Sequence, residues 1–163
     1  MQFTQKNIQL ANQIVEKAIN NKTILVTAES CTGGLISSHL TAIPGSSKVF
    51  TCSFITYSDN SKIQLLGVNK NTIEENGAVS AKVALEMASG GLVKSSASIA
   101  LSVTGIAGPD GGSITKPVGL VYIGLATSDG TRLTEEKRFL GGRDKIRDLT
   151  VHAGLVLISR YLN

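Results

Sequence analysis

Tryptophan is absent from this chain of 163 residues, and aromatic residues make up only 4% of it. Proteins that bind single-stranded nucleic acids usually stack bases on aromatic side chains, so this scarcity argues against that class. The core must therefore be built from isoleucine, valine, leucine and alanine. Hydrophobic residues reach 42% and charged residues 17%, which is typical of a globular protein. We expect a single domain over residues 1–163.

Cysteine and histidine are also scarce. The chain has two cysteines, Cys31 and Cys52, and two histidines, His39 and His152. The cysteines form no CxxC pair, so we expect no metal site. Neither histidine stands in a recognisable motif, which makes a Ser-His-Asp triad hard to build. A serine nucleophile in this chain would need a different base.

Long apolar runs and blocks of like charge are also missing. No stretch is long enough to span a bilayer, and residues 1–6 lack the hydrophobic segment of a signal peptide. The formal net charge is +4, but lysine and arginine form no run of four or more. We therefore expect a cytoplasmic protein with no membrane or nucleic-acid partner. The basic excess fits a small anionic substrate, or simply a solvated surface.

What the chain does contain is a regular alternation of helical and extended patterns. Strands are expected at 23–28, 49–57, 98–103, 121–126 and 132–139. Helices are expected at 4–21, 33–41, 59–66 (with Asp59 as its cap), 72–76, 80–94 and from 144 onward. The last two strands read as a hairpin, so the sheet should be mixed but mostly parallel. These patterns predict an α/β fold, a three-layer α/β/α sandwich.

Three loops should lie at the carboxyl ends of strands, where α/β sheets bind ligands. They span residues 29–34, 57–62 and 104–112. In the first, Ser30 and Thr32 offer hydroxyls, and the loop is either an anion-binding turn or a well-capped structural one. The third is rich in glycine, and it is either a pocket lining of backbone N–H groups or a flexible connector.

Several short motifs occur together and in order. They are Ala28-Glu29-Ser30-Cys31-Thr32-Gly33-Gly34, Pro44-Gly45-Ser46-Ser47, Tyr57-Ser58 followed by Lys62, Gly77-Ala78-Val79-Ser80, Gly105-Ile106-Ala107-Gly108-Pro109-Asp110-Gly111-Gly112 and Lys116-Pro117-Val118-Gly119. This set resembles the CinA C-terminal domain family, the nicotinamide-nucleotide amidohydrolases, over nearly the whole chain. Larger members carry a further N-terminal domain, so we expect the stand-alone form.

The resemblance implies hydrolysis of nicotinamide mononucleotide to nicotinate mononucleotide and ammonia, in pyridine nucleotide recycling. It implies a serine/lysine dyad without metal or cofactor, and a homo-oligomer. A lysine can act as the base if burial lowers its pKa. We assign the dyad to Ser47 and Lys62, with Ser30 as the alternative nucleophile. Tyr57 would steady the lysine or relay a proton.

The shape of the substrate suggests the binding residues. The phosphate would meet Thr32, Gly33, Gly34 and Arg143, and the carboxamide and ribose would meet Thr104, Gly105 and Gly108. Glu29 would orient a hydroxyl or be buried through hydrogen bonds.

Two other functions stay open. One is a nucleotide-binding or regulatory module without turnover, and the other is a cysteine hydrolase that uses Cys31. Gly90 and Gly91 stand late in a predicted helix. Each of these glycines should lower the stability of that helix by about 1 kcal/mol.

Overall fold

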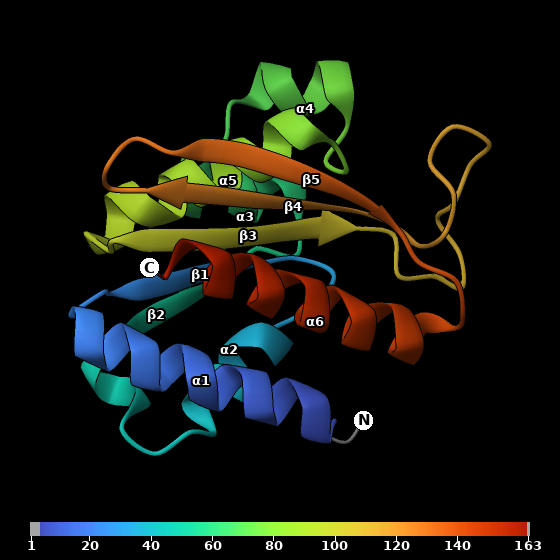
Figure 1. Cartoon of the computed structure of the whole chain (residues 1–163). Helices are drawn as coiled ribbons and strands as arrows, with labels where there is room; N and C mark the ends of the chain where they lie inside the picture. The colour runs from blue at the N-terminus through green and yellow to red at the C-terminus, as the bar shows by residue number, and fades with distance from the viewer. Residues whose placement is uncertain (1–3, 163) are drawn as a thin grey trace.

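Five strands form one mixed sheet in the computed structural model, which describes residues 4–162 (Figure 1). The strands are β1 (Leu25–Glu29), β2 (Phe50–Ile55), β3 (Ile99–Gly105), β4 (Leu120–Thr127) and β5 (Arg132–Arg138). Their order across the sheet is β2-β1-β3-β4-β5. β1 pairs in parallel with β2 and β3, whereas β4 is antiparallel to both β3 and β5. The predicted mixed sheet is confirmed.

The burial of each strand follows its place in the sheet. All residues of β1 are buried, as are the first six of β3, because helices cover both faces of these central strands. β2 and β5 lie at the two edges and are partly exposed. The apolar run in the sequence before residue 104 is therefore a sheet centre, as expected.

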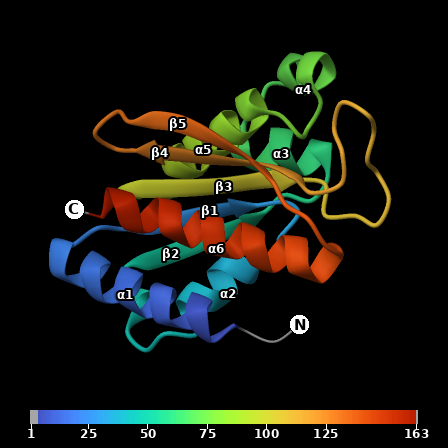
Figure 2. The same ribbon diagram turned by 45° about the vertical axis from the view of Figure 1, so that its right-hand side comes forward.

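Helices cover both faces of the sheet and complete the predicted sandwich (Figures 1 and 2). They are α1 (Gln5–Asn21), α2 (Leu35–Thr41), α3 (Asp59–Leu66), α4 (Lys70–Asn76), α5 (Ala81–Ser95) and α6 (Arg143–Tyr161), with a short 3-10 helix η1 (Ser46–Lys48). α1, α2 and α6 pack on one face; α5 packs on the other, with α3 and α4 against it. Within residues 4–162, no helix combines the length and the apolar character needed to cross a membrane.

The helix ends differ from the predictions in small ways. Ser58, not Asp59, caps α3: its hydroxyl accepts the Ser61 N–H at 3.1 Å, and the Ser61 hydroxyl accepts the Ser58 N–H in return. α2 begins at Leu35 rather than at residue 33, and η1 was not predicted. Ser80 caps α5 as expected. The prediction of one domain over 1–163 extends beyond the described residues and stays a prediction.

The carboxyl ends of β1, β2 and β3 meet at one edge of the sheet. The 106–119 segment leaves β3 at this edge, and α6 begins beside it, on the right of Figure 1. This convergence follows from the parallel pairing of the three strands. All three loops that the sequence singled out therefore lie at the same edge.

Candidate active site

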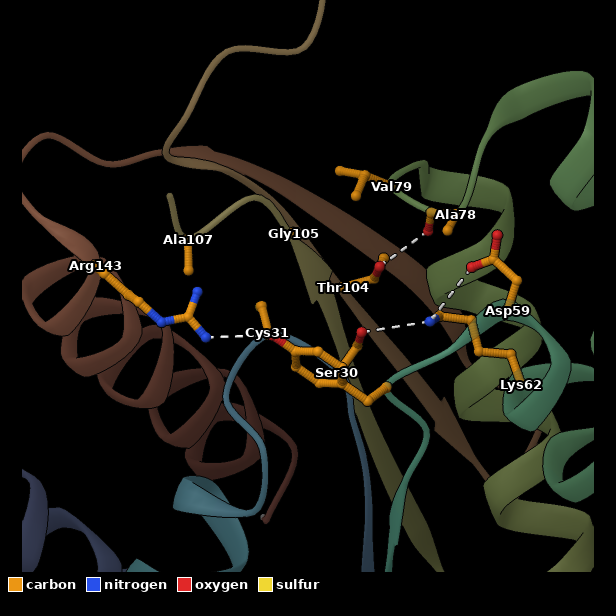
Figure 3. A pocket seen from close by; sticks show the side chains of 11 residues that line it. Ser30, Cys31, Asp59, Lys62, Ala78, Val79, Thr104, Gly105, Ala107 and Arg143 are labelled. Atoms are coloured by element: carbon orange, nitrogen blue, oxygen red, sulfur yellow. Dashed lines mark hydrogen bonds and ion pairs between the residues drawn. The ribbon is translucent and has the colours of Figure 1, made fainter. Parts of the chain in front are cut away.

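A pocket of about 230 Å³ opens at the carboxyl edge of the sheet (Figure 3). It is lined by Ser30, Cys31, Tyr57, Asp59, Lys62, Ala78, Val79, Thr104, Gly105, Ala107 and Arg143. The lining comes from the ends of β1 and β3, the start of α3, the turn before α5 and the start of α6. The pocket thus joins segments that are far apart in the sequence.

Lys62 and Ser30 meet at the floor of this pocket. The Lys62 Nζ donates to Ser30 Oγ at 3.3 Å and to the Thr56 carbonyl at 3.1 Å. Lys62 is only 1% exposed and Ser30 is 8% exposed. A lysine is rarely buried to this degree unless its ammonium is satisfied or its charge is lost. The contact places a nitrogen base beside a hydroxyl.

The surroundings of Lys62 favour the neutral amine. Burial lowers the pKa of Lys62 from its ordinary value of 10.5, because the charged form loses its hydration. The Asp59 carboxylate, 3.8 Å from Nζ, acts in the opposite direction and raises the pKa, but burial has the larger effect. A neutral Lys62 has a lone pair that can accept the Ser30 proton.

The structure does not bring Ser47 to Lys62, which corrects our first choice of nucleophile. Ser47 lies on η1 before β2 begins, whereas Lys62 lies on α3 after β2 ends. The six residues of β2 separate the two ends by about 20 Å at the usual rise per residue. Ser47 is exposed and does not line the pocket. Ser30, the alternative, is the serine beside the lysine.

Glu29 occupies the position where an anion was expected. Its carboxylate is fully buried and accepts the backbone N–H groups of Gly34, Ile36 and Ser37 at 2.8–3.1 Å. It also accepts the hydroxyls of Thr32 at 2.6 Å and Thr27 at 3.2 Å. The carboxylate therefore neutralises the start of α2 as a built-in anion.

This arrangement corrects the phosphate site predicted at Thr32, Gly33 and Gly34. Thr32 is fully buried, and Gly34 gives its N–H to the Glu29 carboxylate. Gly33 donates its N–H to the Ser30 carbonyl at 3.1 Å. None of the three lines the pocket. They shape the turn that presents Ser30, which is the structural reading left open by the sequence.

Arg143 stands at the mouth of the pocket as the first residue of α6. One guanidinium nitrogen donates to the Gly108 carbonyl at 2.9 Å and another to the Tyr57 hydroxyl at 3.2 Å. Tyr57 is 62% exposed, and its hydroxyl partners Arg143 rather than Lys62, whose Nζ donates to Ser30 and Thr56. Gly108 takes part through its carbonyl and does not itself line the pocket. An exposed guanidinium held in this way can receive an anionic group.

Thr104 and Gly105 form the wall at the end of β3. Thr104 is buried and donates its hydroxyl to the Ala78 carbonyl at 2.9 Å. A Cβ at Gly105 would lie 2.7 Å from the Val121 side chain and 2.8 Å from the Leu120 carbonyl, so no larger residue fits. The two predicted positions therefore line the pocket, with Thr104 tied to its opposite wall.

Cys31 lines the same pocket but lacks the features of a nucleophile. Burial raises the pKa of its thiol to about 12, and the nearby Glu29 carboxylate acts in the same direction. The thiol therefore stays protonated near neutral pH. A helix N-terminus can stabilise a thiolate, but the start of α2 already binds the Glu29 carboxylate.

Sequence reasoning passed over four lining residues as site residues: Asp59, Ala78, Val79 and Ala107. Asp59 lies three residues before Lys62 on one helix, a spacing that places two side chains on the same face. Ala78 and Val79 lie within one of the motifs quoted above. Among residues 4–162, no group of three or more His, Cys, Asp or Glu side chains is placed to hold a metal ion.

Comparison with known proteins identifies the relatives of this chain. A family model described as the CinA C-terminal domain matches residues 7–162. A protein of Enterobacter agglomerans named nicotinamide-nucleotide amidohydrolase PncC is 48% identical over 146 residues, which cover 89% of each chain. A relative from Acetivibrio thermocellus, whose name refers to competence and damage induction, is 47% identical over 160 residues. That match covers 98% of this chain but 38% of the relative, and the chain spans less than two fifths of several such relatives.

Solved structures agree with the fold. The competence/damage inducible protein CihA from Agrobacterium tumefaciens superposes with a TM-score of 0.98 at 42% identity, covering 100% of this chain and 99% of that one. A CinA superfamily protein from Escherichia coli gives a TM-score of 0.91 at 31% identity, covering 99% and 94%. The order of strands and helices described above is therefore shared with relatives of known structure.

Proposed function

Because the chain belongs to the CinA C-terminal domain family, we propose that it hydrolyses the carboxamide of nicotinamide mononucleotide to nicotinate mononucleotide and ammonia. The name of the Enterobacter agglomerans relative supports this activity, since that protein matches over most of both chains. The observation that carries the proposal is the buried Lys62 Nζ at 3.3 Å from Ser30 Oγ in an open pocket.

The reaction follows from that contact. Neutral Lys62 accepts the proton of the Ser30 hydroxyl, and Ser30 Oγ attacks the carboxamide carbon. The lysine then returns its proton to the departing nitrogen, which leaves as ammonia, and an ester remains on Ser30. Lys62 then takes a proton from water, which attacks the ester carbon; as the bond to Ser30 Oγ breaks, the lysine returns that proton to Oγ and the nicotinate product leaves. The same lysine thus serves as base and acid in both halves of the reaction.

The other pocket residues take binding roles in this proposal. Arg143, at the mouth, receives the phosphate of the nucleotide, and its contacts with Tyr57 and Gly108 hold the guanidinium in place. Thr104 and Gly105 border the nicotinamide and ribose. The proposal includes pyridine nucleotide recycling by a cytoplasmic homo-oligomer, for which the resemblance is the support.

The buried Lys62 also favours a catalytic function over one of nucleotide binding alone. Burying a lysine costs stability, and its contact with a serine hydroxyl is the one that the proposed reaction requires. Active sites are where such costly groups gather.

The first test measures ammonia and nicotinate mononucleotide released from nicotinamide mononucleotide, with a chelator present. We expect turnover by the wild-type protein, and a loss of about a thousandfold or more in kcat for Ser30→Ala and Lys62→Met. Ser47→Ala is the matched control and should keep the wild-type rate, since Ser47 lies outside the pocket. Loss of activity in Ser47→Ala with full activity in Ser30→Ala would overturn the assignment of the nucleophile.

A further inference from the structure

Hydrogen bonds within the glycine-rich segment after β3 join its two strands of chain, both at its base and at its tip. At its base, Gly119 donates its N–H to the Ile106 carbonyl at 2.8 Å. At its tip, the Ser113 N–H donates to the Lys116 carbonyl at 2.8 Å, and the Lys116 N–H donates to Ser113 Oγ at 3.0 Å. We call residues 106–119 the arm; it projects beyond the sheet in Figures 1 and 2. It is an ordered turn-and-stem rather than a plain connector.

Lys116 ties this arm to the turn between α4 and α5. Its Nζ donates to the Asn76 carbonyl at 2.5 Å and to the Val79 carbonyl at 2.8 Å. Gly77 makes the approach possible, because a Cβ there would lie 2.8 Å from the ammonium. The backbone of Gly77, with φ of +72°, also favours glycine. Two residues in separate sequence motifs, Gly77 and Lys116, thus fit one another.

The turn that Lys116 holds is a wall of the active site. Ala78 and Val79 line the pocket, and Figure 3 shows them across Ser30 from Arg143. The Ala78 carbonyl accepts the Thr104 hydroxyl at 2.9 Å, so the turn is anchored from the sheet as well. Without the Lys116 ammonium, the Asn76 and Val79 carbonyl oxygens would lose this donor, and the turn would lose its tie to the arm.

We propose that Lys116 is a positioning residue that sets the distance between the 77–80 turn and the rest of the pocket, and so fixes the bound nucleotide. The role rests on the proposed function. Lys116 does not line the pocket, so it acts through Ala78 and Val79. Contacts with a wall of this kind serve substrate and transition state alike, so their loss raises KM more than it lowers kcat.

The experiment compares Lys116→Met with the wild-type protein and with Lys94→Met, an exposed lysine on α5. Amide hydrogen exchange is measured without ligand, and kinetics with nicotinamide mononucleotide. For Lys116→Met we expect exchange about tenfold faster in residues 76–80 and 110–118, with β3 unchanged as evidence of folding. We expect KM to rise about tenfold with kcat within about threefold of the wild type. Lys94→Met should match the wild type in both measurements.

The outcomes separate this proposal from the proposed function. If Lys116→Met exchanges faster but keeps the wild-type KM, or if neither measurement changes, the positioning role is overturned. If the wild-type protein does not hydrolyse the nucleotide, the proposed function fails and the positioning role with it, although faster exchange would retain the tie as a structural feature. Should Lys116→Met not fold, Gly77→Ala displaces the ammonium without removing it, and the same two measurements apply.

Discussion

The buried Lys62 is the residue on which the proposed reaction depends most. Lys62 reaches its position along α3, where the Thr56 carbonyl and Ser30 Oγ satisfy its donors. Among basic side chains, lysine and histidine shift toward a neutral form that can accept a proton when water is removed from them, and the two histidines of this chain do not line the pocket. In the proposed reaction, burial of Lys62, which lowers its pKa, therefore takes the place of a histidine as the source of the base.

The pH dependence of the reaction should reveal this lysine. If the neutral amine is the base, as proposed, kcat/KM should rise with pH through the pKa of Lys62, which burial lowers from 10.5. The Asp59 carboxylate raises that pKa, so Asp59→Asn removes the opposing effect and lowers the pKa further. We expect the rising limb of the pH profile to move to lower pH in this variant.

The matched control for this prediction is Glu74→Gln, which removes an exposed carboxylate that pairs with Lys70 on another helix. It should leave the profile unchanged. The side chain of Asp59 is 58% exposed, so the difference between Asp59→Asn and the wild type should shrink as salt is added. A limb that moves to higher pH in Asp59→Asn, or that does not move at low salt, would contradict the role of Lys62 as the base.

The choice between Ser30 and Ser47 shows where residue-level prediction succeeds and fails. Both serines stand in short motifs that also contain glycine, so local pattern alone does not separate them. The strand predicted over 49–57 does separate them, because it lies between Ser47 and Lys62 in the sequence and places these two residues at its opposite ends. Ser30 and Lys62 both follow a strand, and parallel neighbours end at the same edge. Reading the serines against the strand directions would have favoured Ser30.

At the scale of elements, the two adjacent glycines of α5, Gly90 and Gly91, differ in how closely neighbouring elements approach them. A Cβ at Gly90 would lie 1.9 Å from the Leu66 carbonyl oxygen, at the end of α3. A Cβ at Gly91 would meet its nearest atoms at 3.8–3.9 Å, which is ordinary contact. α3 carries Lys62, so Gly90 allows α5 to pack closely against the helix that holds the proposed base.

This difference gives a matched pair of substitutions. Gly90→Ala should lower the free energy of unfolding by about 1–3 kcal/mol, because α3 and α5 must move apart. Gly91→Ala should raise it by up to about 1 kcal/mol, since alanine favours the helix and fits the space. Urea denaturation measures both, and Gly90→Ala should also lose more activity. Equal losses of stability in the two variants would show that the Leu66 contact is not the reason for Gly90.

The glycines also mark the limit of prediction at this scale. Apolar periodicity placed every long helix and all five strands, because burial of one face decides those elements. The same sequence reasoning treated Gly90 and Gly91 alike, as a loss of helix propensity. Their separate roles depend on how closely two helices approach, which periodicity does not contain. The burial of Glu29 under α2 was likewise only one of two readings, since nothing local distinguishes a helix cap from a ligand site.

At the scale of the whole molecule, the pocket exists only when the sheet is assembled. Ser30 follows β1, Lys62 lies beyond β2, Thr104 ends β3 and Arg143 begins α6. The strand order β2-β1-β3 puts Ser30 at the centre, with the lysine on one side and the threonine on the other. A ligand that touches all of these segments binds the folded state and has no site on the unfolded chain.

Ligand binding should therefore stabilise the entire fold. Nicotinate mononucleotide, the proposed product, is not consumed, and at a hundredfold excess over its Kd it should add about 2.7 kcal/mol. For a chain of this length, that corresponds to an increase in Tm of about 5 to 11 °C, which thermal denaturation would measure. Arg143→Gln should lose most of the increase, because the guanidinium at the mouth is proposed to hold the phosphate.

The same measurement of Tm, made on Ser30→Ala, distinguishes catalysis from binding. This variant keeps the wall and Arg143, so the product should still raise its Tm, yet it should release no ammonia from nicotinamide mononucleotide. If the protein only bound nucleotides, the wild type itself would be stabilised by the nucleotide and would release no ammonia. Wild-type protein that is stabilised by the nucleotide without releasing ammonia would therefore assign the pocket to binding alone. Turnover by the wild type, together with stabilisation without turnover in Ser30→Ala, would attribute the chemistry to the Ser30 hydroxyl and the binding to the surrounding fold.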